Sequence, residues 1–475
     1  MSRPATATPT AKFTEGSTLR HVIVMTATGS VGLIAIFIVD ALNLFYISML
    51  GVSELAAAVG FASTLLFFTI SVSIGFTIAC GALVARALGR GNREDAAAMG
   101  GASLVFMALA SGIVTIAAWP FIEELLVLLG AKGETLALST RFLQIVLPST
   151  PIVALGMCTT GILRGVGDAR RSTYVTLGAG VAAAILDPIF IFGLDLGLDG
   201  AAIATVLSRI VMLGIGLHGA HVVHRLVRLP NLVRLRSAVG PFFGIGVPAL
   251  LTQVATPLGN AFVTAEIAAF GDDAVAGWAI IGRIIPVAFG VIFALSGAVG
   301  PILGQNFGAR RYDRLLQTMR DSLLVTVVYV LAMWALLALF AGPVADLFGA
   351  TGLSRDLVLF FCYFVASCFL FDGAIFVASA AFNNLGFPTY STAFNWARST
   401  LGIIPFAWVG AHYFGAEGVL AGRGLGAVVF GVASMIVCFR VVRRLAVEPP
   451  PEEPVPALPP AAQSPFSTGK AATLP

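Results

Sequence analysis

The sequence predicts an all-α integral membrane protein with twelve transmembrane helices in two pseudo-symmetric six-helix lobes. Three observations support this fold class: the composition, an internal repeat and the distribution of basic residues. Of the 475 residues, 58% are hydrophobic and 11% are charged, and the mean hydropathy is +0.94. A soluble globular protein cannot bury such a share of apolar residues, so the composition indicates a chain that crosses a membrane many times.

The internal repeat pairs segments that lie 219 positions apart. Residues 161–173 (GILRGVGDARRST) align with 380–392 (AAFNNLGFPTYST), which places Gly167 on Gly386. Residues 84–91 (VARALGRG) align with 303–310 (LGQNFGAR) at the same offset. Residues 51–60 align with 271–280 at an offset that is larger by one residue. Two parallel repeats, related by an axis along the membrane normal, can hold a cavity between them and rock against each other. The repeat therefore predicts a transporter.

Apolar stretches long enough to cross about 30 Å of hydrocarbon can be marked twelve times along the chain. They lie at 21–50, 55–88, 97–121, 135–163, 172–193, 200–224, 239–270, 274–307, 322–348, 356–382, 391–412 and 417–442.

These stretches divide the chain into five parts. We expect an N-terminal tail (1–19), an N-lobe with spans 1–6 (20–224), a basic linker loop interrupted by proline (225–238), a C-lobe with spans 7–12 (239–445) and a disordered Pro-rich tail (446–475). The first 19 residues have no apolar core, so we expect no cleavable signal peptide.

The basic residues favour both termini in the cytoplasm. With that orientation, the tails and the loops on their side contain 21 of the 28 Lys and Arg residues, and the loops on the other side contain three. Basic residues resist translocation, so this asymmetry supports twelve spans with both ends inside. The net charge of +4 then reflects topology, and we expect no nucleic-acid partner.

Carboxylates inside spans are the natural candidates for function, because each costs roughly 2.5–3.5 kcal/mol at a helix centre. Asp40 in span 1 and Asp187 in span 5 fall in the outer half of the N-lobe and can face each other. Pro188 has no N–H, so it leaves the Ala184 carbonyl free and predicts a bend. Acids in such a cavity can exchange a proton for a substrate.

Structural roles are the alternatives for these side chains. Asp40 can simply hydrogen-bond Asn43, and Asp187 can cap the bend at Pro188. Glu266 near the end of span 7 is interpreted as an interfacial residue, whereas Asp372 in an aromatic stretch of span 10 is interpreted as functional.

An enzyme is not expected. No HExxH, GxSxG or Walker motif occurs, and the glycine-rich stretch 422–426 lies inside an apolar span, where close helix packing explains it. The five cysteines contain no CxxC pair, so we expect neither a disulfide nor a metal site.

Several motifs resemble those of the multidrug and toxic compound extrusion (MATE) family over nearly the whole chain. They are Val39-Asp40 leading into 55–60 (LAAAVG), 162–168 (ILRGVGD), 186–193 (LDPIFIFG) with 200–205 (GAAIAT), and 304–308 (GQNFG). The resemblance implies export of organic cations or drugs by antiport with H⁺ or Na⁺ across a bacterial inner membrane. It also implies that Asp40 and Asp187 form the cation-coupling site, and that Asp372 corresponds to the acid of the tenth helix in the NorM-like branch.

The departures from the family pattern favour H⁺ over Na⁺. The family often carries Asn where this chain has Ala183, which removes one ligand of a first-lobe cation site. The span-7 glutamate of the NorM-like branch is replaced by Gln253 or Thr256. Span 1 lacks proline, so bending there would need Gly29 or Gly32.

The predicted coupling residues are therefore Asp40, Asp187 and Asp372. Asn260 occupies the repeat position of Asp40, which suggests that proton handling is confined to the first lobe. The predicted substrate cavity is lined by Asn43, Gln253, Thr256, Asn260, Phe289 and Phe293.

We expect no cofactor other than the coupling ion, and we expect a monomer whose partners are small organic cations and membrane lipids. The alternatives are a lipid-linked oligosaccharide flippase of the same superfamily, an exporter of an endogenous metabolite, and a channel or non-transporting sensor.

Overall fold

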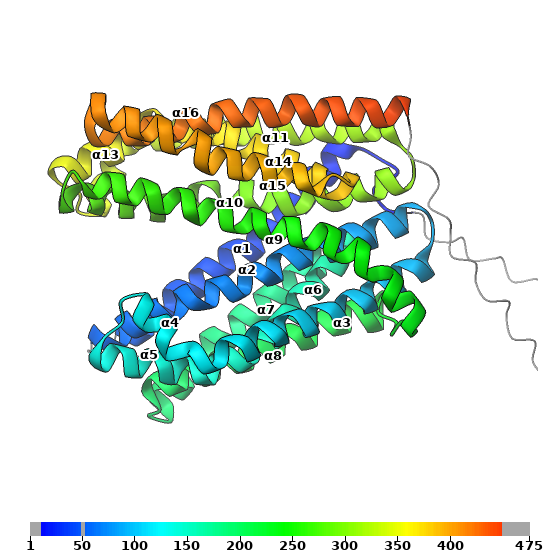
Figure 1. Ribbon diagram of the computed structural model, residues 1–475, viewed down its shortest axis with the longest axis horizontal. Coiled ribbons are helices and arrows are strands. Elements are labelled where there is room, and N and C mark those ends of the chain that lie inside the picture. Colours follow the sequence, from blue (N-terminus) through cyan, green and yellow to red (C-terminus); the bar gives the residue numbers. More distant parts are fainter. Residues whose placement is uncertain (1–10, 49–52, 449–475) are drawn as a thin grey trace, which may run out of the picture.

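The computed structural model describes residues 11–48 and 53–448, except the side chains of residues 40, 41, 44, 45, 48, 53, 54 and 56. Within this part of the chain every regular element is a helix, and the helices form two bundles (Figure 1). The all-helical prediction is confirmed.

The N-lobe crosses the membrane six times, and prolines interrupt several of its crossings. The crossings are α1 (Thr18–Ser48), α2 (Ser53–Gly89), α3 (Arg93–Ala118) with η1 (Trp119–Phe121) and α4 (Ile122–Leu128), α5 (Gly133–Val146) with η2 (Leu147–Ser149) and α6 (Thr150–Val166), α7 (Ala169–Pro188) with the π-helical turn η3 (Ile189–Gly193), and α8 (Gly197–Leu217) with the π-helical turn η4 (His218–Val223).

The C-lobe repeats this order. Its helices are α9 (Leu232–Ala268), α10 (Asp272–Gly308), α11 (Tyr312–Leu339) with α12 (Ala341–Leu347), α13 (Gly352–Tyr363) with η5 (Val365–Cys368) and α14 (Phe369–Leu385), and α15 (Pro388–Ala397) with the π-helical turn η6 (Arg398–Gly402) and α16 (Ile404–Val447).

Twelve crossings result. Eleven stretches of the described chain are long and apolar enough to cross a membrane, and the last of them, Pro388–Val447, is 60 residues long. Gly415 breaks α16 with φ 64° and ψ −148°, a conformation that suits glycine. The last stretch therefore contains two crossings.

The loop between the lobes is shorter than predicted. α9 begins at Leu232, inside the predicted linker, because the Asn231 side chain accepts a hydrogen bond from the Arg234 N–H at 2.9 Å. An asparagine at this position satisfies one of the free N–H groups of the first helical turn.

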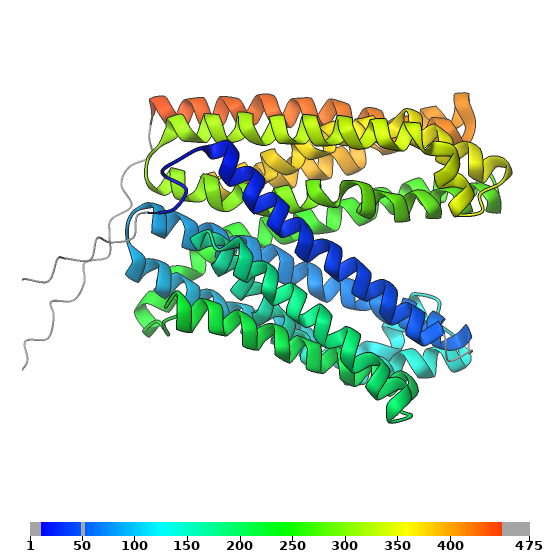
Figure 2. The same cartoon turned by 180° about the vertical axis from the view of Figure 1, so that it is seen from behind.

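The first helix of each lobe lies between the lobes. α1 packs on α7 of its own lobe and on α10 and α11 of the other, while α9 packs on α15 and α16 and also on α2 and α3. The ribbons of the two lobes converge where α1 begins and α16 ends, and they diverge toward the opposite end (Figures 1 and 2). We call the converging end the basic end, because Arg90, Arg171, Arg228 and Arg310 lie in or beside its turns.

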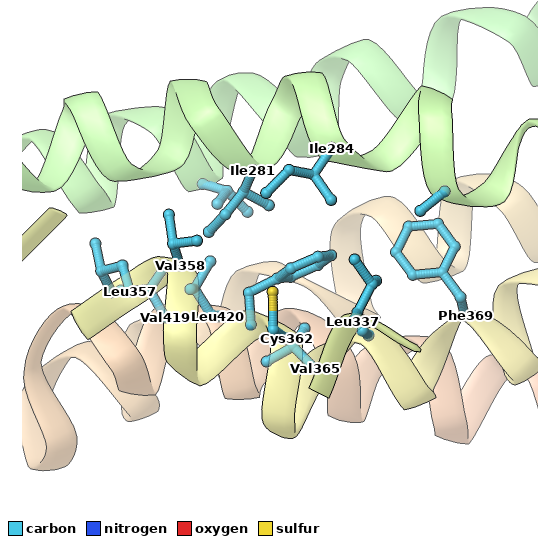
Figure 3. Close-up of a cluster of buried hydrophobic side chains, with 14 of the residues drawn as sticks. Ile281, Ile284, Leu337, Leu357, Val358, Cys362, Val365, Phe369, Val419 and Leu420 are labelled. Carbon is cyan, nitrogen blue, oxygen red and sulfur yellow. The ribbon is translucent and has the colours of Figure 1, made fainter. Parts of the chain in front are cut away.

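Each lobe has its own buried core. In the C-lobe, Ile281 and Ile284 of α10 face Val358 and Cys362 of α13 and Phe369 of α14 (Figure 3).

The glycine-rich stretch of α16 lets two helices touch in this lobe. A Cβ on Gly422 would lie 2.2 Å from the Phe406 carbonyl oxygen, and one on Gly426 would lie 1.9 Å from that of Gly402. The prediction that this stretch serves helix packing is confirmed.

Candidate functional site

Asp187 is a buried acid in the N-lobe with a neutral partner. Its side chain is 1% exposed, and its Oδ2 accepts a hydrogen bond from Asn43 Nδ2 at 3.1 Å. The other carboxylate oxygen has no hydrogen-bond partner among the described residues. Pro188 ends α7 directly after it, and the chain continues as the π-helical turn η3. The break predicted at Pro188 therefore takes the form of a wider helical turn, a feature often found at functional sites.

Close packing of α1 on α7 brings Asn43 to Asp187. Thr173 donates a hydrogen bond to the Thr28 carbonyl at 2.8 Å, and a Cβ on Gly180 would lie 2.9 Å from the Val39 side chain. Asp40 follows Val39 on the same helix, but its side chain lies outside the described residues. Its coupling role stays a prediction.

Asp372 is a buried acid in the C-lobe with a charged partner. It is 3% exposed and forms an ion pair with Arg398, which is 4% exposed. Arg398 also donates a hydrogen bond from Nη2 to Thr256 Oγ1 at 3.0 Å. Two predicted residues, Asp372 and Thr256, are thus joined through an arginine to which the sequence analysis assigned no role.

A second arginine adjoins this ion pair. The guanidinium of Arg423 lies 5.8 Å from the Phe369 ring centroid and 5.9 Å from that of Trp278, which is the range of a cation–π contact. It also lies near enough to the Asp372 carboxylate for the two opposite charges to attract. The Nε atoms of both arginines have no partner among the described residues. The buried centre therefore holds two guanidinium groups and one carboxylate.

The other predicted cavity residues are dispersed. Phe289 is fully buried and stacks on Phe369 with ring centroids 4.0 Å apart, so it belongs to the C-lobe core. Gln253 and Asn260 are half-buried on α9. Phe293 lines a cavity of about 130 Å³ between the lobes, to which α1, α6, α7 and α10 contribute.

The wall of this cavity carries the side chain of Arg164, whose Nε donates a hydrogen bond to Ser172 Oγ at 3.1 Å. Gly29 and Gly32, the predicted points of bending, line the same cavity. A Cβ on Gly32 would lie 2.6 Å from Thr176 Oγ1, so α1 and α7 are in direct contact there.

The repeated segments bind each other across the lobes at the basic end. Arg86 Nε donates to the Asn384 carbonyl at 2.8 Å, and Gln305 Nε2 donates to the Gly165 carbonyl at 2.7 Å. Both donors and both acceptors are repeat equivalents, each pair 219 positions apart.

The glycines of the repeat obey the same symmetry. A Cβ on Gly89 would lie 2.1 Å from the Gln305 carbonyl oxygen, and one on Gly308 would lie 2.2 Å from that of Arg86. The contact is reciprocal, as a pseudo-two-fold axis between the lobes requires.

A segment before α1 binds both lobes at the same place. Phe13 is 1% exposed; its N–H donates to Gln305 Oε1 at 2.9 Å, and its carbonyl accepts from Arg314 at 2.9 Å. The Lys12 ammonium donates to the Gly167 carbonyl in the N-lobe at 2.8 Å. No sequence pattern predicted a role for this segment, although Phe13 is the one aromatic residue among the first 19.

Comparisons with known proteins agree with this arrangement. The MatE family model matches residues 30–189 and 248–409, one match in each lobe. The chain is 28% identical to the FAD transporter of Shewanella oneidensis, over 90% of this chain and 94% of that protein. It is 25% identical to the multidrug export protein MepA of Staphylococcus aureus, over 88% and 93% of the two chains.

Among solved structures, the MATE transporter VcmN of Vibrio cholerae in its bent form superposes with a TM-score of 0.85. It is 26% identical and covers 90% of this chain and 98% of its own. The two family matches together span more than half of the chain, and the fold agrees with that of the solved structure. The chain belongs to the MATE family of multi-pass membrane transporters.

Proposed function

We propose that the protein is a proton-coupled antiporter that exports small organic cations, and that the N-lobe carries the coupling site. The observation that supports this is the environment of Asp187. Among the described residues its hydrogen-bond donor is the neutral amide of Asn43, and one of its oxygens has no partner. A carboxylate in this environment can take up a proton without breaking an ion pair, whereas Asp372 is held by Arg398.

The proposed cycle follows from charge. With Asp187 ionised, a cationic substrate is attracted to the N-lobe side of the cavity. A proton entering from outside neutralises the carboxylate and removes that attraction, so the substrate leaves outward. Each charge that moves inward is worth about 2.3 kcal/mol per 100 mV. In this orientation both termini and the basic end lie in the cytoplasm of a bacterial cell, and the closed basic end corresponds to an outward-facing state.

The test is ethidium transport in proteoliposomes, driven first by an imposed pH gradient and then by an imposed Na⁺ gradient. We expect transport with the pH gradient alone and its loss in Asp187→Asn. Glu266→Gln is the matched control, because it removes a half-buried acid on α9 outside the proposed site. Transport driven by Na⁺ alone would overturn the proton assignment, and no transport under either gradient would overturn the cation substrate.

A second candidate substrate is an anionic, phosphate-bearing cofactor. The buried C-lobe centre contains two guanidinium groups against one carboxylate, and guanidinium groups suit phosphates. One relative is an FAD transporter. The same vesicles with FAD in place of ethidium test this alternative. FAD transport that is lost in Arg423→Gln would support it, and transport of ethidium alone would exclude it.

A further inference from the structure

A second hollow lies on the C-lobe, away from the cavity between the lobes. It has a volume of about 480 Å³ and is formed by α11, α14 and α16, none of which lines the cavity between the lobes. α16 runs along the edge of the C-lobe that is remote from the N-lobe (Figures 1 and 2). We call this hollow the α16 groove. It shares no lining residue with the cavity between the lobes.

The α16 groove is apolar along its length and charged at one end. Val327, Phe371, Val432 and Ile436 are among its apolar walls, and Arg440 and Arg443 close it. Val432 and Ile436 are 44% and 46% exposed, so an occupant can contact them. From Val432 to Arg443 α16 rises about 16 Å, close to half of a hydrocarbon core of about 30 Å. The groove therefore spans about one leaflet.

Both arginines are available to a ligand. Arg440 and Arg443 are exposed, lie one helical turn apart, and make no ion pair or hydrogen bond with any described residue. Their neighbour Arg444 differs, because its Nε lies 3.4 Å from Glu448 Oε2. Guanidinium groups bind phosphate oxygens through paired hydrogen bonds. The charged end of the groove thus suits one phosphodiester anion.

We propose that the α16 groove binds an anionic phospholipid of the leaflet at the basic end. One acyl chain lies against Val432, Ile436 and Phe371, and the headgroup phosphate lies between Arg440 and Arg443. Basic pockets between transmembrane helices recognise anionic headgroups by the same combination. The lipid would contact α14 at Phe371, next to Asp372.

The test compares retention of two lipids by the purified full-length protein in detergent. Phosphatidylglycerol and phosphatidylcholine with identical acyl chains are added, and bound lipid is counted by native mass spectrometry. The wild type should retain phosphatidylglycerol preferentially. The double variant Arg440→Gln/Arg443→Gln should lose roughly tenfold or more of that preference, since each arginine near a membrane surface contributes about fivefold.

Two further variants separate the groove from general surface charge. Arg444→Gln removes the neighbouring arginine that faces Glu448 and should leave the preference unchanged. Val432→Trp fills the groove and should reduce retention of both lipids. An unchanged preference in the double variant would overturn the proposal, as would an equal loss in Arg444→Gln. Thermal unfolding is also measured with inorganic phosphate and with phosphatidylglycerol. If phosphate protects the protein as well as the lipid does, the ligand of the groove is a free anion, and the lipid proposal is wrong. The readout is binding, so it does not depend on which substrate is transported.

Discussion

The two lobes share a fold, but the buried acid of each lobe has a different hydrogen-bonding partner. In the N-lobe, Asp187 faces a neutral amide and ends a helix that widens into a π-helical turn. In the C-lobe, Asp372 is paired with Arg398, which begins the π-helical turn η6. At the 219-residue offset of the repeat, Phe406 occupies the position of Asp187, so the C-lobe has no acid there. The same scaffold thus gives one buried acid a neutral partner and the other a charged partner.

The largest expected effect is on stability, and it separates the two acids. Arg398→Gln leaves Asp372 buried without its partner, which should lower the free energy of unfolding by about 3–5 kcal/mol. Asp187→Asn removes no ion pair and should change stability by less than about 1 kcal/mol. Thermal unfolding in detergent measures both. If Arg398→Gln is as stable as Asp187→Asn, the distinction between the lobes is wrong.

The second prediction compares the acids in transport. Asp187→Asn should reduce pH-driven transport by roughly 5- to 150-fold, the range of a typical coupling free energy. The double variant Asp372→Asn/Arg398→Gln removes both charges of the C-lobe pair together and should keep pH-driven transport within about threefold of wild type. Initial rates in proteoliposomes are the measurement. Equal losses in both proteins would mean that the C-lobe acid also carries protons.

The third prediction concerns a feature that the lobes share. Gly89→Ala and Gly308→Ala should each weaken closure at the basic end by about 1–3 kcal/mol, because the added methyl group meets the backbone of the opposite lobe. Spin labels at Arg170 and Tyr390, exposed near the turns of the two lobes, should report longer distances in both variants. A longer distance in only one of the two variants would mean that the two glycine contacts do not contribute equally to closure.

The smallest effect involves Asp168, which caps α7 and whose repeat position is occupied by Phe387. Burial raises the pKa of Asp168, but hydrogen bonds from His224 and Arg171 outweigh it and hold that pKa below the ordinary value of 3.8. An acid with a lowered pKa stabilises the fold fully above its unfolded value, and that stabilisation is lost as the pH falls through the folded value.

Asp168→Asn keeps a capping side chain but has no charge to titrate. The variant should lose under about 1 kcal/mol at neutral pH, and the difference from wild type should shrink as the pH falls below about 4. Unfolding midpoints across that range test this; a difference that grows toward acid would contradict it.

Sequence patterns predicted the features that depend on composition and repetition. Apolar stretches gave the crossings, and the repeat identified the segments that meet at the basic end, including Gly89 and Gly308. Asp187 was found because an acid in an apolar helix is costly.

The rest depends on side-chain register, which no sequence pattern reports. Arg398 and Asp372 are 26 positions apart and meet because α14 and α15 pack on each other on either side of the turn at Gly386. The segment around Phe13 has no periodicity, so only the folded chain shows that it lies between the lobes.

The reciprocal contact at the basic end has a consequence for leakage. Its two glycine contacts join the same pair of helices, since α2 supplies Gly89 and Arg86 while α10 supplies Gln305 and Gly308. Moving one helix away from the other breaks both contacts at once. The two contacts therefore open together, which disfavours a half-open state that would let ions run down their gradient between cycles.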